Sequence, residues 1–416
     1  MVNDHQPRSN ALIARSRRLD HEIDLIDFAG ARGVMWSSGT VGLAGQGEAA
    51  RLAVPPGDPA AAAHSVHAVL DTIEVDDQVE GPGTGPVAFG ALAFDPTCPG
   101  VLVVPRVIVG RAADGTYWVT HLLHPDEPMP IFDDATVVKP EPTATRFTVS
   151  SPRSASDWQA SVVAVREELR RDTARKVVMA RELVVDADAP IRRADVLRQL
   201  RVAYPSCMLF AFEGFVGATP ELLVARSGDQ VRSHPMAGTA PRSSDPTTDA
   251  RLASDLLASS KDRVEHRYTI DMVHDTLLPW CSFLDEEAEP SIVAMANVQH
   301  LATLVEGRLS SPPASVIELM RALHPTPAVN GTPRQVALEL IAAHEGVDRG
   351  RYAGPVGWVD ADGNGEWAVG IRSAELDGNR ARVFAGVGVV ADSDPDAELA
   401  ETRAKFQAIL GAIIRP

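Results

Sequence analysis

Two pairs of acidic residues stand three positions apart in segments whose pattern predicts helices. Asp262 and Glu265 form one pair, and Glu398 and Glu401 form the other, with Lys405 one turn beyond Glu401. Residues three apart lie on one face of a helix. Carboxylates without neighbouring Cys or paired His suit Mg²⁺, which keeps several waters and often takes only one or two carboxylates. A solvated helix face is the simpler explanation of any single pair, so the pairs alone leave both interpretations open.

A lysine and a glutamate in apolar segments are candidates for acid–base chemistry. Lys176 opens the predicted strand KVVMARELVV, and Glu221 lies within the predicted apolar strand segment TPELL (219–223). Burial favours the neutral forms, a lysine amine that acts as a base and a protonated carboxyl group that acts as an acid. The alternative for Lys176 is a side chain that reaches water from the end of a strand. The alternative for Glu221 is a charged residue of an edge strand, beside the irregularity that Pro220 causes.

Lysine is rare in this chain. Of the 39 basic residues only four are lysine, namely Lys139, Lys176, Lys261 and Lys405. An ammonium group is a compact point charge that can lose its proton when buried, whereas a guanidinium group stays charged. Each of these positions therefore raises the question of what an ammonium does there that a guanidinium cannot.

Composition limits the classes of function. The net charge of −17 disfavours nucleic acid and membrane surfaces as partners, although local cations or a metal can still hold a small anion. Cys98, Cys207 and Cys281 are too far apart for a disulfide framework or a zinc site. Neither a membrane span nor an apolar secretory segment is evident, so we expect a cytoplasmic protein.

The elements that must position these residues follow an α+β pattern. Residues 1–150 are predicted to be strand-rich, with strands at 87–95, 101–110 and 116–123, and 139–156 has linker composition. Residues 151–416 are predicted to form the second part.

In that second part, helical spacing indicates helices at 156–172, at about 247–279 and at about 314–323. Strands are expected over 207–236, with turns at Gly217 and at 227–229, and again over 351–390. Asp394 and Pro395 are start signals for a further helix.

An ordered set of motifs strongly resembles the chorismate-utilising enzymes, a family that includes isochorismate, salicylate, anthranilate and aminodeoxychorismate synthases. The motifs are KVVMAR (176–181), TPELL (219–223), HPMAGT (234–239), KDRVEH (261–266), VQHLAT (298–303), LHPTPAVNG (323–331), IRSA (371–374) and FAGVGVVADSDPDAELAETRAK (384–405). The resemblance covers about residues 155–412 and extends more weakly to GQGEAAR (45–51) and FGALAFDP (89–96). It implies one large duplicated α+β unit, in which orthogonally packed β-sheets are flanked by helices.

The resemblance also implies roles, position by position. Lys176 would be the general base that activates water, and Glu221 the general acid for the leaving hydroxyl group. The magnesium site would consist of Glu265 and Glu401, with Asp262 and Glu398 as direct or water-mediated supports. The remaining substrate-binding positions are Gly238 and Thr239 for the ring carboxylate, His300 near the ring, and Arg372, Gly388 and Lys405 for the enolpyruvyl carboxylate.

The nucleophile distinguishes the activities within the family. Anthranilate synthases, which use ammonia, carry Gln at the position of Lys176, so a lysine there favours hydroxyl transfer. Salicylate synthases share that lysine, but they tend to carry Leu and a polar residue where this chain has Ile371 and Phe384. We therefore expect a magnesium-dependent isochorismate synthase that acts on chorismate as a monomer. Salicylate synthase is the main alternative, and an ammonia-using synthase component is a more distant one.

Overall fold

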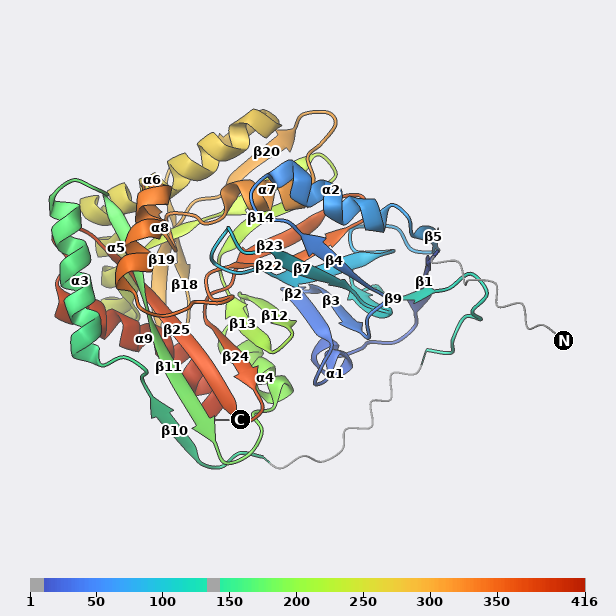
Figure 1. Cartoon of the computed structure of the whole chain (residues 1–416), viewed down its shortest axis with the longest axis horizontal. Helices are drawn as coiled ribbons and strands as arrows, with labels where there is room; N and C mark the ends of the chain where they lie inside the picture. Colours follow the sequence, from blue (N-terminus) through green and yellow to red (C-terminus); the bar gives the residue numbers. More distant parts are fainter. Residues whose placement is uncertain (1–10, 133–142, 416) are drawn as a thin grey trace.

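A computed structural model describes residues 11–132 and 143–415, and three sheets occur within these ranges (Figure 1). Part of the predicted linker at 139–156, with Lys139, lies outside the described residues. The largest sheet has 13 strands. Twelve follow one another in the order β10 (Phe147–Ser150), β11 (Lys176–Ala187), β25 (Arg380–Val389), β24 (Ser373–Asp377), β13 (Phe215–Thr219), β12 (Met208–Phe212), β2 (Val34–Ser38), β3 (Val41–Gln46), β8 (Val107–Arg111), β9 (Tyr117–Leu123), β1 (Ile13–Leu19) and β5 (Glu74–Asp77), while β21 (Gly331–Thr332) pairs with β11.

The second sheet has nine strands, and a small third sheet has three. The nine-stranded sheet has the order β17 (Cys281–Glu286), β20 (Val305–Leu309), β15 (Gln230–His234), β14 (Leu222–Ser227), β23 (Gly365–Val369), β22 (Pro355–Asp360), β6 (Val87–Ala91), β7 (Gly100–Val104) and β4 (Ala50–Val54). The small sheet has the order β16 (Met236–Pro241), β19 (Val298–Ala302) and β18 (Ser291–Ala294). Both large sheets contain strands from before and after residue 150.

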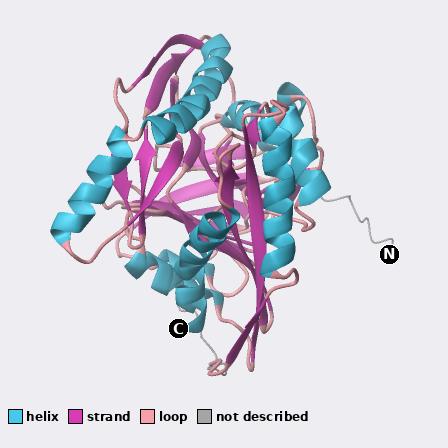
Figure 2. Cartoon of the chain, turned by 90° about the vertical axis from the view of Figure 1, so that its left-hand side faces the viewer, coloured by secondary structure: helices cyan, strands magenta, loops and turns pink. Residues whose placement is uncertain are grey.

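Helices lie outside the sheets (Figure 2). They are α1 (Leu25–Ala29), α2 (Pro59–Leu70), α3 (Ala155–Arg170), α4 (Arg193–Ala203), α5 (Pro246–Ala258), α6 (Ser260–Leu277), α7 (Val316–Leu323), α8 (Arg334–His344) and α9 (Pro395–Ile414), with a 3₁₀ turn η1 (Leu278–Trp280). The elements α3, α4, α8 and α9 contact the largest sheet, α2 and α7 contact the nine-stranded sheet, and α5 and α6 contact the small sheet. The expectation of an α+β fold with large sheets flanked by helices is confirmed.

Two large apolar cores pack against the largest sheet of the described residues. One core is shared by the two large sheets, where Trp36 and Phe210 of one sheet join Trp367 of the other. The second lies on the helical side of the largest sheet and includes Phe406 and Ile409 of α9. No helix among residues 11–132 and 143–415 is both long enough and apolar enough to cross a membrane.

Several predicted elements are confirmed with small changes, and others are wrong. The predicted strand 101–110 is two strands, because Pro105, which has no N–H group to donate, lies where the chain passes from the nine-stranded sheet to the largest one. The predicted helix 247–279 is two helices, since Ser259 is extended and accepts the Asp262 N–H as the N-cap of α6.

The predicted turn at Gly217 is also wrong. Gly217 lies inside β13, and the turn falls at Glu213 and Gly214, both with positive φ angles (+43° and +83°) as a tight hairpin requires. Gly217 is instead a packing position, because a Cβ atom there would lie 2.5 Å from the Phe210 ring.

Candidate active site

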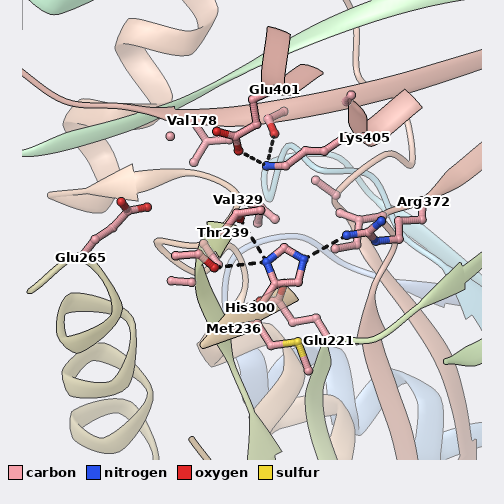
Figure 3. Close-up of a pocket in the computed structure, with 18 of the residues that line it drawn as sticks. Val178, Glu221, Met236, Thr239, Glu265, His300, Val329, Arg372, Glu401 and Lys405 are labelled. Atoms are coloured by element: carbon pink, nitrogen blue, oxygen red, sulfur yellow. Dashed lines mark hydrogen bonds and ion pairs between the residues drawn. The ribbon is translucent and has the colours of Figure 1, made fainter. Parts of the chain in front are cut away.

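One cavity of about 240 Å³ lies where β11, β25, the small sheet, α6 and α9 meet (Figure 3). Every site residue that the sequence analysis named lines this cavity, namely Lys176, Glu221, Gly238, Thr239, Asp262, Glu265, His300, Arg372, Gly388, Glu398, Glu401 and Lys405. Lys261 lines it as well, so all three lysines of the described residues meet here. Residues more than 200 positions apart in the sequence are thus brought to one place.

Lys176 is the first residue of β11, and its side chain is 3% exposed. Its Nζ atom lies 2.7 Å from Oε1 of Glu265, which α6 carries. Burial tends to raise the pKa of Glu265, but the charge and hydrogen bond of Lys176 outweigh that effect and leave the pKa below its ordinary value. Gly388 of β25 makes room for this pair, because a Cβ atom there would lie 2.7 Å from Cε of Lys176.

Glu221 lies between strands rather than within one, because β13 ends at Thr219 and β14 begins at Leu222. Its side chain is buried, and Oε1 has no hydrogen-bond partner among the described residues. Burial raises the pKa of Glu221 to about 8, although the charges of Lys176 and Lys405 oppose the shift. This carboxyl group is therefore largely protonated at neutral pH, and it can donate a proton into the cavity.

His300 and Arg372 form a buried network on another wall. Arg372 donates from Nη2 to Nε2 of His300 over 2.9 Å, so Nδ1 must carry the imidazole proton. That nitrogen lies 3.0 Å from Oγ1 of Thr239 and 3.2 Å from the carbonyl oxygen of Gly238. Burial lowers the pKa of His300 to about 3, helped by the charges of Arg372 and Lys405, so the ring is neutral.

Arg372 keeps unused donors in this arrangement. Its side chain is 7% exposed, and its Nε and Nη1 atoms have no hydrogen-bond partner among the described residues. Its φ angle of +50° is unusual for a residue with a side chain. A buried guanidinium group with free donors at a cavity is suited to an anionic group of a ligand.

The four carboxylates named as metal ligands come from α6 and α9. Asp262 accepts a hydrogen bond from the Ser259 hydroxyl group, and Glu398 accepts one from Ser393 over 2.7 Å. Burial raises the pKa of Glu398. The hydrogen bond from Ser393 lowers this pKa, and the nearby charge of Glu401 raises it, so the pKa stays above its ordinary value. Lys405 lies 2.8 Å from Oε1 of Glu401 and also donates to the carbonyl oxygen of Gly386 over 2.8 Å.

The oxygen atoms of these four carboxylates are of the donor type that binds a hard cation. Within the described ranges, no group of three or more His, Cys, Asp or Glu side chains is close enough to hold a metal ion. Glu265 and Glu401 are each paired with a lysine instead. Even so, all four carboxylates face one cavity and offer only oxygen atoms, which is the donor type that Mg²⁺ takes.

A family model described as "Chorismate binding enzyme" matches residues 29–414. The chain belongs to the chorismate-binding enzyme family. A MenF protein of Mycobacterium tuberculosis, provisionally assigned as an isochorismate synthase, is 40% identical over 346 residues, which are 80% of this chain and 87% of the relative. The isochorismate synthase DhbC of Bacillus subtilis is 43% identical over 252 residues, which are 58% of this chain and 63% of the relative.

A solved structure supports the same family. The crystal structure of a Bacillus anthracis protein, provisionally assigned as the 2,3-dihydroxybenzoate-specific isochorismate synthase DhbC, matches with a TM-score of 0.79 and 34% identity. The match covers 93% of this chain and 98% of the other. The resemblance in the motifs, the matched family model and the fold therefore agree.

The two residues used to choose among activities in this family also line the cavity. Ile371 and Phe384 face the space that Lys176 and Glu221 face. Phe384 is 3% exposed and stacks on the ring of Tyr352, with centroids 5.2 Å apart and an interplanar angle of 18°. Both side chains at which salicylate synthases tend to differ from this chain therefore line the cavity that holds Lys176 and Glu221.

Sequence reasoning missed two further polar residues that line this cavity. Arg349 and Tyr352 line the cavity from the segment that follows α8. The only sequence signal was the dense charge of DRGRY (348–352), and the pattern is equally typical of an exposed turn. Their burial, at 4% and 6% exposure, results from tertiary packing.

Proposed function

We propose that this protein is an isochorismate synthase, which adds water at C2 of chorismate and expels the C4 hydroxyl group. One observation carries the proposal. A buried lysine and a carboxyl group that stays protonated at neutral pH line the same small cavity, and the two halves of a hydroxyl substitution require such groups. The names of the relatives DhbC and MenF support the same activity.

In the proposed reaction, Lys176 acts as the neutral amine, after the ammonium group has lost its proton and the ion pair with Glu265 has broken, and Nζ then takes a proton from the attacking water. Glu221 gives its proton to the C4 oxygen, which departs as water. One water is consumed and one is released, so substrate and product are isomers and the reaction should be readily reversible. Burial favours the uncharged forms of both groups, the neutral amine of Lys176 and the protonated carboxyl group of Glu221, which are the forms that these two roles need.

The cationic side of the cavity would bind the substrate. Arg372 and Lys405, with the backbone of Gly388, would hold the enolpyruvyl carboxylate, which agrees with the free donors of Arg372. Gly238 and Thr239 would meet the ring carboxylate. The neutral His300 would lie beside the ring, its orientation fixed by Thr239 and Arg372.

Magnesium belongs to the proposal as the cofactor. Glu265 and Glu401 would hold it, with Asp262 and Glu398 as direct or water-mediated supports. Bound magnesium would supply a fixed positive charge for the ring carboxylate of the substrate. The orientation that Ser259 and Ser393 give to the supporting carboxylates is consistent with that role.

Three further expectations accompany the activity. We propose that residues 1–150 are an integral part of the catalytic unit, since both large sheets contain strands from this region. A monomeric state and a cytoplasmic location stay predictions.

The deciding experiment is a product analysis. Purified protein is incubated with chorismate and Mg²⁺ at neutral pH, and the products are separated by chromatography. Isochorismate in equilibrium with chorismate is the expected result. Stoichiometric salicylate and pyruvate would instead identify a salicylate synthase, and an aminated product with added ammonium would identify an ammonia-using enzyme.

A further inference from the structure

The strand that begins with Lys176 has a gap along one edge. On its inner edge, β11 pairs with β25 from Val177 to Asp186. On its outer edge, β21 pairs only with Lys176 and Val177, and β10 pairs only with Val184 to Ala187. Between these two short pairings, no strand of the described residues covers the outer edge of β11.

An ion pair between Glu345 and Arg349 fills part of this gap. The Trp158 indole group fills another part by donating to the carbonyl oxygen of Ala180 over 2.9 Å. Glu345 accepts the backbone N–H of Ala180 over 2.7 Å, and Arg349 donates to the carbonyl oxygen of Val178 over 2.7 Å. The side chains of Glu345 and Arg349 are joined by two hydrogen bonds of 2.6 Å each, and they are 1% and 3% exposed. The pair thus supplies one donor and one acceptor of those that a neighbouring strand would supply.

The same guanidinium group ties a second wall of the cavity to β11. Nη1 of Arg349 donates to the carbonyl oxygen of Val329 over 2.9 Å, and the group stacks 4.1 Å from the centroid of the Phe94 ring. Val178 and Val329 both line the cavity. Val178 is two residues after Lys176, so their side chains point to the same face of the strand.

We propose that Glu345 and Arg349 are positioning residues, which fix Lys176 relative to the ring of the substrate. The proposal rests on the proposed function. A buried ion pair contributes little net stability compared with an apolar pair of the same volume, because desolvation offsets the attraction. Its advantage here is geometric, since a bidentate pair of planar groups holds two backbone segments in one arrangement.

Two variants test the proposal. Arg349→Lys keeps the charge, but a point-like ammonium group cannot reproduce the fork of contacts to Glu345, Val178 and Val329. Glu345→Gln keeps the shape and removes the charge. For each, kcat should fall about 10-fold to 100-fold because the base is misplaced. KM for chorismate should stay within about twofold, since the groups that bind substrate are unchanged.

A matched control lies on the same strand. Glu182 pairs with Arg382 over 2.6 Å, and neither residue lines the cavity. Glu182→Gln removes one charge from an Arg–Glu pair that joins β11 to β25, and kcat should remain within about twofold of the wild type. All rates are divided by the folded fraction, measured by near-ultraviolet circular dichroism under the assay conditions.

The outcomes separate this proposal from the proposed function. If the wild type makes no isochorismate, the proposed function fails. If the wild type is active and folded Arg349→Lys matches it in kcat per folded molecule, the positioning role is rejected. It is rejected too if both variants unfold, since the pair is then a stability element, or if Glu182→Gln loses as much activity as they do.

Discussion

Replacing Glu221 by Gln should make the protein more stable at neutral pH while abolishing turnover. Gln has the shape of a protonated Glu, but it never has to hold a proton. In the wild type, the buried carboxyl group has a pKa of about 8 instead of its ordinary 4.5. Between these values the folded protein keeps a proton at Glu221 that the unfolded chain releases.

The size of the effect follows from this difference in pKa. Because the folded state binds the extra proton, the contribution of Glu221 to stability is fully present below its ordinary pKa and is lost as the pH rises to about 8. Each pH unit in that window removes about 1.4 kcal/mol. Between about pH 5 and about pH 8, the wild type should therefore lose roughly 3 to 4 kcal/mol of stability relative to Glu221→Gln, because the loss per pH unit is smaller near each of the two pKa values.

Denaturant unfolding of both proteins at several pH values measures this difference. Taking the difference between the two proteins cancels the titration of other groups. Glu48→Gln is the control, because Arg51 lowers the pKa of that exposed carboxyl group through a hydrogen bond, so no loss with rising pH is expected. A stability difference between wild type and Glu221→Gln that stays flat from pH 5 to pH 8 would refute the protonated-acid assignment.

Three further substitutions test other parts of the site. Glu401→Gln should abolish turnover without changing thermal unfolding, and full activity in excess chelator would contradict the magnesium assignment. Lys176→Gln should reduce isochorismate formation at least about 100-fold, the usual scale for a positioned base, as followed by chromatography. Gly388→Ala should lower kcat at least about tenfold by pushing Lys176 aside. Gly411→Ala, where an added Cβ atom meets nothing within 4 Å, should leave kcat unchanged.

Local signals predicted those elements whose ends depend on nearby residues. Asp394 and Pro395 start α9 as expected, and Trp158 and Val162 face the core from α3. The break at Ser259 could not be predicted in the same way, because serine is also tolerated inside helices and its capping role is clear only once α6 turns toward the small sheet.

The residues of the site could be predicted from the sequence, but the contacts between them could not. The motifs identified the candidate site residues, of which Lys176 is the first in the chain and Lys405 the last. All of these candidate site residues line one cavity. Spacing could not reveal that Lys176 contacts Glu265, since the two lie on different elements. The same is true of the contacts of Arg349 to the Val178 and Val329 carbonyl groups. Such contacts are set by the packing of whole elements, which no local pattern encodes.

The pairing of β11 with β25 has a consequence during synthesis. About 200 residues separate the two strands in the chain, so a ribosome that adds roughly 5 to 20 residues per second needs about 10 to 40 s to supply the partner. Throughout that interval the inner edge of β11, with apolar residues such as Val177 and Met179, has no strand to cover it. Nascent chains arrested before residue 380 should therefore be cut by proteases within β11 and retained by chaperones, whereas chains extended through α9 should resist both.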